Sequence, residues 1–228
     1  MKRATIVAVA MAVSLVLVLS AAVWAAPVGT VTANLTGEWT DGTISLYGVR
    51  QVEGYGGFYL LNKTAGTGQG ALIANGEVKS ICSDLMQNST NSSIVYDVVL
   101  VRDAPSPANP GLFGLARETA LRELWGRHYA TATASQALAE AFSAAAWEIM
   151  YEDAGTWDVT SGTGFYCTGA DTTQANTWLA TLDGTGPMAN LRALVCSDAQ
   201  DYIIEVPEPA TLGFLAVGGL IALLRRKR

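Results

Sequence analysis

The last residues of the chain, 206–228, most constrain how it can fold. They read VPEPATLGFLAVGGLIALLRRKR and divide into three parts. Pro207 and Pro209 fix φ and disfavour helix in the residues before them, so we expect an extended backbone there. The apolar run 212–224 favours lipid over water, although its thirteen residues cover only ~20 Å as a helix. The tail therefore predicts a short transmembrane helix outside the folded body.

This tail resembles the PEP-CTERM sorting signal of Gram-negative bacteria. The sorting motif is Val206, Pro207, Glu208 and Pro209, and the basic membrane-stop cluster is Arg225, Arg226, Lys227 and Arg228. Basic residues of this kind are retained on the cytoplasmic side of a membrane. The resemblance implies recognition by an exosortase, a membrane protease-transpeptidase that cuts near Pro-Glu-Pro and releases or re-attaches the protein at the cell surface. An ordinary C-terminal membrane anchor is the alternative.

Residues 1–26 have the composition of a signal peptide. Lys2 and Arg3 form a positive n-region, 4–19 form an apolar h-region, and small residues allow cleavage after Ala25 or Ala26. This segment predicts export through the Sec translocon and removal by signal peptidase, with an uncleaved anchor as the alternative. Neither terminal segment enters the prediction of the fold.

Removing both signals makes the remaining chain strongly acidic. The body keeps eight basic and twenty acidic residues, a net charge of −12, against −6 for the whole chain. Such a surface repels nucleic acid and anionic lipid, so nucleic-acid binding is excluded. The body is long enough for one domain or two small ones.

Residues 27–103 are predicted to be rich in β-structure. Short runs of β-branched and aromatic residues at 28–32, 43–47, 57–61 and 94–101 are separated by Gly, Asn and Asp turns. Three prolines within 104–110 stop any regular element, so this stretch is the predicted boundary between two regions.

Residues 111–206 are predicted to be mainly helical with a closing strand. Apolar residues at spacings of three and four predict a helix after residue 111. A second helix is expected from about Ser135 to Tyr151, with Glu140 and Glu148 on a different face from its apolar residues. Further helices are expected at 171–182, capped by Asp171 or Thr172, and at 187–195. Phe165 and Tyr166 suggest a short strand, and 201–206 the closing one.

A second resemblance involves the body. The segment Ile81-Cys82-Ser83-Asp84-Leu85, together with the helix segment 143–152 (SAAAWEIMYE), is similar to the motifs of bacterial thioester domains. In that family a cysteine thiolate and a glutamine side chain form an internal thioester that captures amines. Ser143 stands where the glutamine belongs, and serine has no side-chain carbonyl. Gln136 lies two helical turns earlier, ~10 Å away along the helix. Cys82 and Ser143 are therefore degenerate thioester positions.

The three cysteines allow one disulfide in an exported chain. Cys167 and Cys196 flank the third and fourth expected helices and are the preferred pair, with Cys82–Cys167 as the competing pair. A metal site is not expected, because the chain has no CxxC spacing and a single histidine.

No set of catalytic residues is predicted, and no cofactor. His128 is expected to cap carbonyls at a helix end rather than act as a base. Glu148 and Glu152 are four residues apart, as on an exposed helix face. Asp153 and Asp158 lack the spacing of a calcium loop.

The sequence thus predicts an exported α+β protein whose β-rich sandwich or barrel-like part packs on a small helical part. We expect a non-enzymatic structural or adhesive role in the exopolysaccharide or biofilm layer. One rival function is a covalent adhesin with a Cys-Gln thioester. The other is a secreted carbohydrate-active hydrolase, which would need a pair of carboxylates converging in a cleft.

Overall fold

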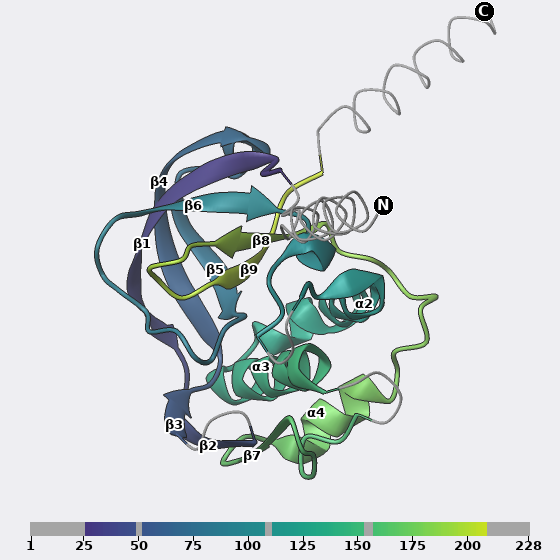
Figure 1. Cartoon of the computed structure of the whole chain (residues 1–228). Helices are drawn as coiled ribbons and strands as arrows, with labels where there is room; N and C mark the ends of the chain where they lie inside the picture. Colours follow the sequence, from purple (N-terminus) through teal and green to yellow (C-terminus); the bar gives the residue numbers. More distant parts are fainter. Residues whose placement is uncertain (1–25, 49–51, 108–110, 153–156, 209–228) are drawn as a thin grey trace, which may run out of the picture.

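The computed structural model describes residues 26–48, 52–107, 111–152 and 157–208 (Figure 1). The predicted signal peptide up to residue 25, Pro209, the apolar run 212–224 and the basic cluster 225–228 lie outside these ranges. Within the described ranges, every helix is too short or too polar to cross a membrane.

The centre of the body is a closed antiparallel barrel of six strands. Its order is β1-β4-β5-β9-β8-β6. The strands are β1 (Gly29–Trp39), β4 (Phe58–Gly68), β5 (Gly76–Cys82), β6 (Ile94–Val99), β8 (Leu191–Val195) and β9 (Tyr202–Glu205). In β1, Val31, Ala33 and Leu35 are buried and the residues between them are less so, which is the alternation of a strand with one face on the core. The last two strands in the sequence thus complete a barrel begun by the first ones.

Three helices in the described ranges pack beside the barrel. They are α2 (Gly114–Ala132), α3 (Gln136–Tyr151) and α4 (Thr172–Leu179), and short 3-10 turns η1 (Gln69–Leu72) and η2 (Val101–Asp103) follow β4 and β6. In Figure 1 the helices lie together on one side, below the barrel strands. The side chains of Ser135 and Asp171 accept hydrogen bonds from Leu138 N and Gln174 N and cap α3 and α4. Of the two caps predicted for α4, Asp171 and Thr172, the structure has Asp171.

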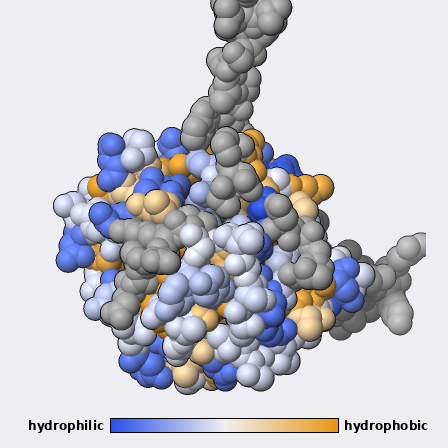
Figure 2. Space-filling model, turned by 60° about the horizontal axis from the view of Figure 1, so that its bottom comes forward, coloured by the Kyte–Doolittle hydropathy of each residue, from blue (hydrophilic) through white to orange (hydrophobic). Residues whose placement is uncertain are grey.

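A second, three-stranded sheet adjoins the end of the barrel where β1 ends and β4 begins, and its strand β7 contacts α3. It has the order β3-β2-β7, with β2 (Thr43–Gly48), β3 (Val52–Tyr55) and β7 (Phe165–Thr168). Figure 2 shows the molecule turned so that the bottom of Figure 1, where this small sheet lies, comes forward. The face in view is mostly hydrophilic, and its hydrophobic areas are small and separated.

The core is organised around α3. Every residue of α3 from Ala139 to Tyr151 is buried, because the helix touches α2, α4, β4 and β7. Its five buried alanines allow these neighbours to approach closely. Phe142 and Trp147 contact the aromatic rings of Phe58 and Phe165 respectively. Glu148, predicted on a solvated face, is instead buried, and Glu140 is buried as well.

The predicted body of β-strands and helices is confirmed in outline, and one element is wrong. Residues 191–195 form strand β8 rather than part of a helix over 187–195. Leu191, Ala193 and Leu194 suit either structure by composition, but their backbone pairs with both β6 and β9. Barrel pairing therefore overrides the local helix preference.

Candidate functional site

The first residue of the sorting motif is held in the folded body. Val206 directly follows β9 and is 1% exposed. Its N–H donates to the backbone oxygen of Asn190 at 2.8 Å, and Asn190 Nδ2 donates back to the Val206 oxygen at 3.0 Å. Pro207 and Glu208, the next two motif residues, are exposed. Within the described residues, the buried part of the chain thus ends at Val206.

Neighbouring side chains keep this pair in place. Arg192 donates from Nη1 to Asn190 Oδ1 at 2.8 Å. Arg122 of α2 donates from Nε to the Ala189 oxygen at 2.8 Å, and Ala189 N donates to the Arg122 oxygen at 2.9 Å. The segment that receives Val206 is therefore fixed to α2 on one side and to β8 on the other.

Glu205, the residue before Val206, is also bound to a helix. Trp125 donates from its indole Nε1 to Glu205 Oε2 at 3.2 Å. The last strand residue and the first motif residue are thus each tied to the body by a side chain.

The body begins and ends at the same end of the barrel. Gly29 at the start of β1 pairs with Val98 near the end of β6, and Leu191 at the start of β8 pairs with Glu205 at the end of β9. Because β6 and β8 are antiparallel neighbours, the start of β1 and the end of β9 lie on one side. Figure 1 shows residues 206–208, in yellow, leaving there.

A family model of known proteins matches this part of the chain. It describes the PEP-CTERM protein-sorting motif and covers residues 205–228. The tail is a PEP-CTERM sorting signal. The match confirms the resemblance seen in the sequence, and it indicates an exported protein that an exosortase sorts toward the cell surface. Comparison with curated proteins and with solved structures found no match to the chain.

The two degenerate thioester positions, Cys82 and Ser143, both lie in the folded body that carries the PEP-CTERM tail. Cys82 ends β5, and its backbone oxygen accepts a 2.8 Å hydrogen bond from Trp147 Nε1 of α3. Ser143 Oγ accepts from Gly57 N at 2.8 Å and donates to the Glu140 oxygen at 2.9 Å. Gln136 is the first residue of α3, ~16 Å along the helix from Trp147. Because Ser143 Oγ binds Gly57 N, the Ser143 hydroxyl fixes the backbone just before β4.

The three cysteines are free thiols, so neither predicted disulfide is present. Cys167 lies on β7 in the small sheet, whereas Cys196 follows β8 in the barrel and Cys82 ends β5. The side chains of Cys82 and Cys167 are buried, and burial raises the pKa of both thiols, that of Cys167 to about 12. Cys196 is partly exposed. A buried thiol with a raised pKa is a poor nucleophile.

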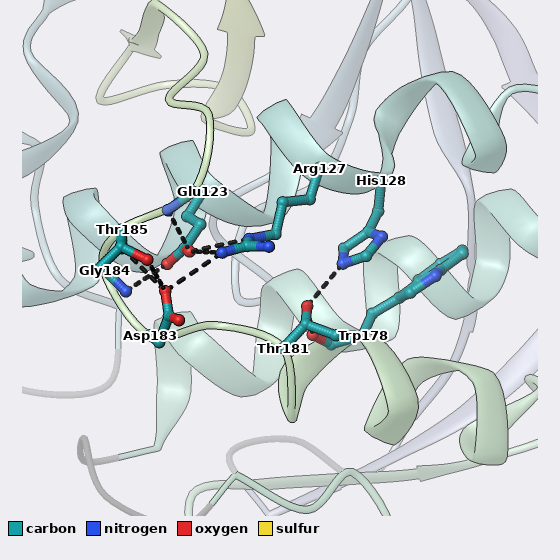
Figure 3. Close-up of polar contacts among 9 residues, drawn as sticks. Glu123, Arg127, His128, Trp178, Thr181, Asp183, Gly184 and Thr185 are labelled. Atoms are coloured by element: carbon teal, nitrogen blue, oxygen red, sulfur yellow. Dashed lines mark hydrogen bonds and ion pairs between the residues drawn. The ribbon is translucent and has the colours of Figure 1, made fainter.

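Three buried glutamates in the helices accept hydrogen bonds from loops and hold those loops in place. Glu140 Oε1 accepts hydrogen bonds from Thr40 Oγ1, Asp41 N and Gly42 N at 2.6, 2.7 and 3.0 Å, which fixes the turn between β1 and β2. Glu123 accepts from Gly184 N and Gly186 N at 2.7 and 2.9 Å and from Arg127 Nε at 2.9 Å (Figure 3). Sequence reasoning missed both roles, because the partners are backbone groups far away in the chain.

Glu148 is the third of these glutamates, and one of its oxygens is unsatisfied. It is fully buried, and Oε1 accepts from Asp158 N at 2.9 Å. Oε2 is buried without a hydrogen-bond partner among the described residues. Burial, with the nearby charges of Glu152 and Asp158, raises the pKa of Glu148 to about 7. Glu152 accepts from Gly164 N and Phe165 N at 2.5 and 2.9 Å, so it also fixes a loop.

His128 does not cap the carbonyls of a helix end as predicted. It lies in the last turns of α2, and its Nε2 is 2.8 Å from Oγ1 of Thr181, in the turn that follows α4 (Figure 3). Its ring stacks on Trp178 with centroids 5.3 Å apart. Burial and the charge of Arg127 lower the pKa of His128. The imidazole thus joins two helices.

A cavity of about 560 Å³ lies beside the barrel. Asp84, Asp97, Asp198 and Asp201 line it, along with Gln87 and Cys196. Gln87 bridges the two ends of the segment 196–201, because it donates to the Cys196 oxygen and accepts from Asp201 N. In the ranges that the structure describes, no three His, Cys, Asp or Glu side chains are placed to hold a metal ion.

Proposed function

We propose that this protein is an exported structural or adhesive component of the exopolysaccharide layer, delivered by its PEP-CTERM tail. The observation that carries the proposal is the direct continuity of the sorting motif with β9, through Val206. In this proposal the tail is the sorting signal, and the compact acidic body is the part of the protein that is exported and delivered. The Sec translocon and signal peptidase would act on residues 1–26 before the exosortase acts on the tail.

The contacts of the reactive side chains support a non-enzymatic body. Glu123, Glu140 and Glu152 bind backbone N–H groups, and His128 joins α2 to α4. A glycoside hydrolase needs two carboxyl groups on either side of a substrate cleft. Glu148 and Glu152 are instead turned toward the loop 157–165, through Asp158 N and Phe165 N.

The contacts around Cys82 support a thioester-domain-like scaffold without the thioester. The hydrogen bond from Trp147 to Cys82 brings the cysteine segment and the tryptophan helix together, as the resemblance implies. The acyl half of the bond has no source at Ser143, because serine has no side-chain carbonyl, and its hydroxyl is instead bonded to Gly57 and Glu140. Covalent adhesion through a thioester is therefore the less supported function.

Fractionation of cells that express tagged full-length protein tests the proposal. We expect the wild-type chain to be processed and recovered at the cell surface or in the extracellular matrix. A Pro207→Ala/Pro209→Ala variant should accumulate as an unprocessed membrane-bound precursor. Identical processing and location of the two proteins would contradict sorting through the motif. Loss of biofilm cohesion in a deletion strain, restored by wild-type protein, is the expected result for the matrix role.

A further inference from the structure

The matched sorting signal and the folded body overlap by two residues. The PEP-CTERM match begins at residue 205, which is the last residue of β9, and Val206 is buried immediately after it. Both backbone groups of Val206 are bonded to Asn190. The N-terminal flank of Pro-Glu-Pro is therefore part of the native structure.

The chain between the body and the predicted membrane span is short. Six residue steps separate Val206 from Leu212, where the apolar run begins, so an extended chain covers at most ~20 Å. A membrane-inserted precursor thus holds the end of the barrel close to the lipid. An enzyme that cuts near Pro-Glu-Pro has to bind the chain within this space.

Enzymes that bind an extended peptide use its main-chain N–H and C=O groups for affinity. Those groups are available at Glu208 but engaged at Val206. Releasing Val206 breaks its two hydrogen bonds with Asn190 and exposes its side chain. If the enzyme binds the main chain of Val206, the residue before Pro207, then Val206 must separate from Asn190 before the enzyme can bind productively.

We propose that Asn190 is a positioning residue that limits exosortase processing by holding Val206 in the body. The inference rests on the proposed sorting function and adds its regulation. The motif is recognised when Val206 separates from Asn190, so the stability of this contact sets the processing rate. Arg192 strengthens the contact by fixing the Asn190 amide through Oδ1.

Pulse-chase labelling of the full chain, in cells that contain the exosortase, tests this proposal. Asn190→Ala removes the side-chain bond to Val206, and we expect the half-time of the precursor to fall roughly fivefold, as for the loss of one hydrogen bond. Asn62→Ala is the matched control. Asn62 bonds Asn34 on neighbouring barrel strands, away from the tail, and this change should leave the half-time unaltered.

An insertion gives a second test that does not disturb the core. Gly-Ser-Gly-Ser placed between Val206 and Pro207 moves the intact Pro-Glu-Pro away from the body and should also shorten the half-time. Half-times equal to wild type in both Asn190→Ala and the insertion variant would overturn the inference. That result leaves sorting itself intact as long as Pro207→Ala/Pro209→Ala is still unprocessed. Normal processing of the double proline variant would instead defeat the proposed function.

Discussion

Trp147 of α3 donates a 2.8 Å hydrogen bond from its indole nitrogen to the backbone oxygen of Cys82, at the end of β5. Both residues are fully buried. This bond joins the central helix to the barrel at a point where the chain leaves a strand. A buried carbonyl that loses its partner is costly, so the bond is a sensitive point of the fold.

Trp147→Phe keeps an aromatic ring but removes the donor. We expect it to lower the free energy of unfolding by about 1–3 kcal/mol, because the Cys82 oxygen is left unsatisfied. Urea denaturation followed by circular dichroism measures the change. Trp39→Phe, at a partly buried ring that stacks on Phe58, is the control and should cost less. Equal effects of the two changes would contradict a special role for the bond.

Glu140→Ala tests the carboxylate that fixes the turn between β1 and β2. Three donors lose the carboxylate as an acceptor, although Thr40 Oγ1 and Gly42 N still bond within the turn. We expect a destabilisation of about 2–4 kcal/mol. Hydrogen exchange should show loss of protection at Asp41 and Gly42. Glu77→Ala, at an exposed residue of β5, is the comparison and should change little. A stable Glu140→Ala variant with unchanged exchange would refute this role.

Glu148 predicts a decline of stability with rising pH. Its pKa is about 7 in the folded protein and 4.5 is its ordinary value, so the folded state keeps a proton that the unfolded chain has released. The contribution of this bound proton to the free energy of unfolding is fully present below pH 4.5 and falls between pH 4.5 and 7. Above pH 7 it no longer changes, and the total loss is up to about 3 kcal/mol.

Glu148→Gln should flatten this pH profile and raise stability at pH 8. Part of the slope should remain, because burial also raises the pKa of Asp201 to about 7. Asp201→Asn should then reduce the rest. Thermal unfolding at pH 5, 6, 7 and 8 measures these effects, and a slope unaltered by Glu148→Gln would show that the carboxyl is ionised throughout.

The thiols predict a simple labelling pattern. Under native conditions maleimide should modify Cys196 quickly and leave Cys82 and Cys167 unmodified, because both are buried with raised pKa values. In urea without reductant all three should react, as counted by mass spectrometry. Modification of only one thiol in urea would reveal a disulfide and restore the pairing predicted from sequence.

Intact mass separates the scaffold from the thioester adhesin. We expect the mature protein to have the full mass of its sequence and to ignore methylamine. A deficit of ~17 Da, which is the mass of the ammonia lost when a cysteine thiolate displaces a glutamine amide, would establish a thioester. Cys82→Ala should abolish any such deficit.

Local signals predicted the parts of the fold that depend on local chemistry. Ser135 and Asp171 mark helix starts because a cap bonds within its own turn. The PEP-CTERM tail was readable for a similar reason, since its parts are contiguous. Strand β8 was not, because its identity comes from pairing with β6 and β9 rather than from its own residues.

The long-range contacts could not be predicted from spacing. Glu148 looks solvated by its place in the sequence, yet loop 157–165 covers it. Asn190 carries no motif, and its bonds to Val206 exist because the start of β8 lies opposite the end of β9. Such partners are set by topology, which one sequence does not encode in any local pattern.

Closure of the barrel has a consequence for proteins crowded at a surface. A sheet with open sides offers unpaired backbone groups on which another chain can grow. All six barrel strands have neighbours on both sides, so adjacent copies cannot lengthen the barrel by β-addition. In the described body, polymerisation through strands would have to start from β3 or β7, the outer members of the small sheet.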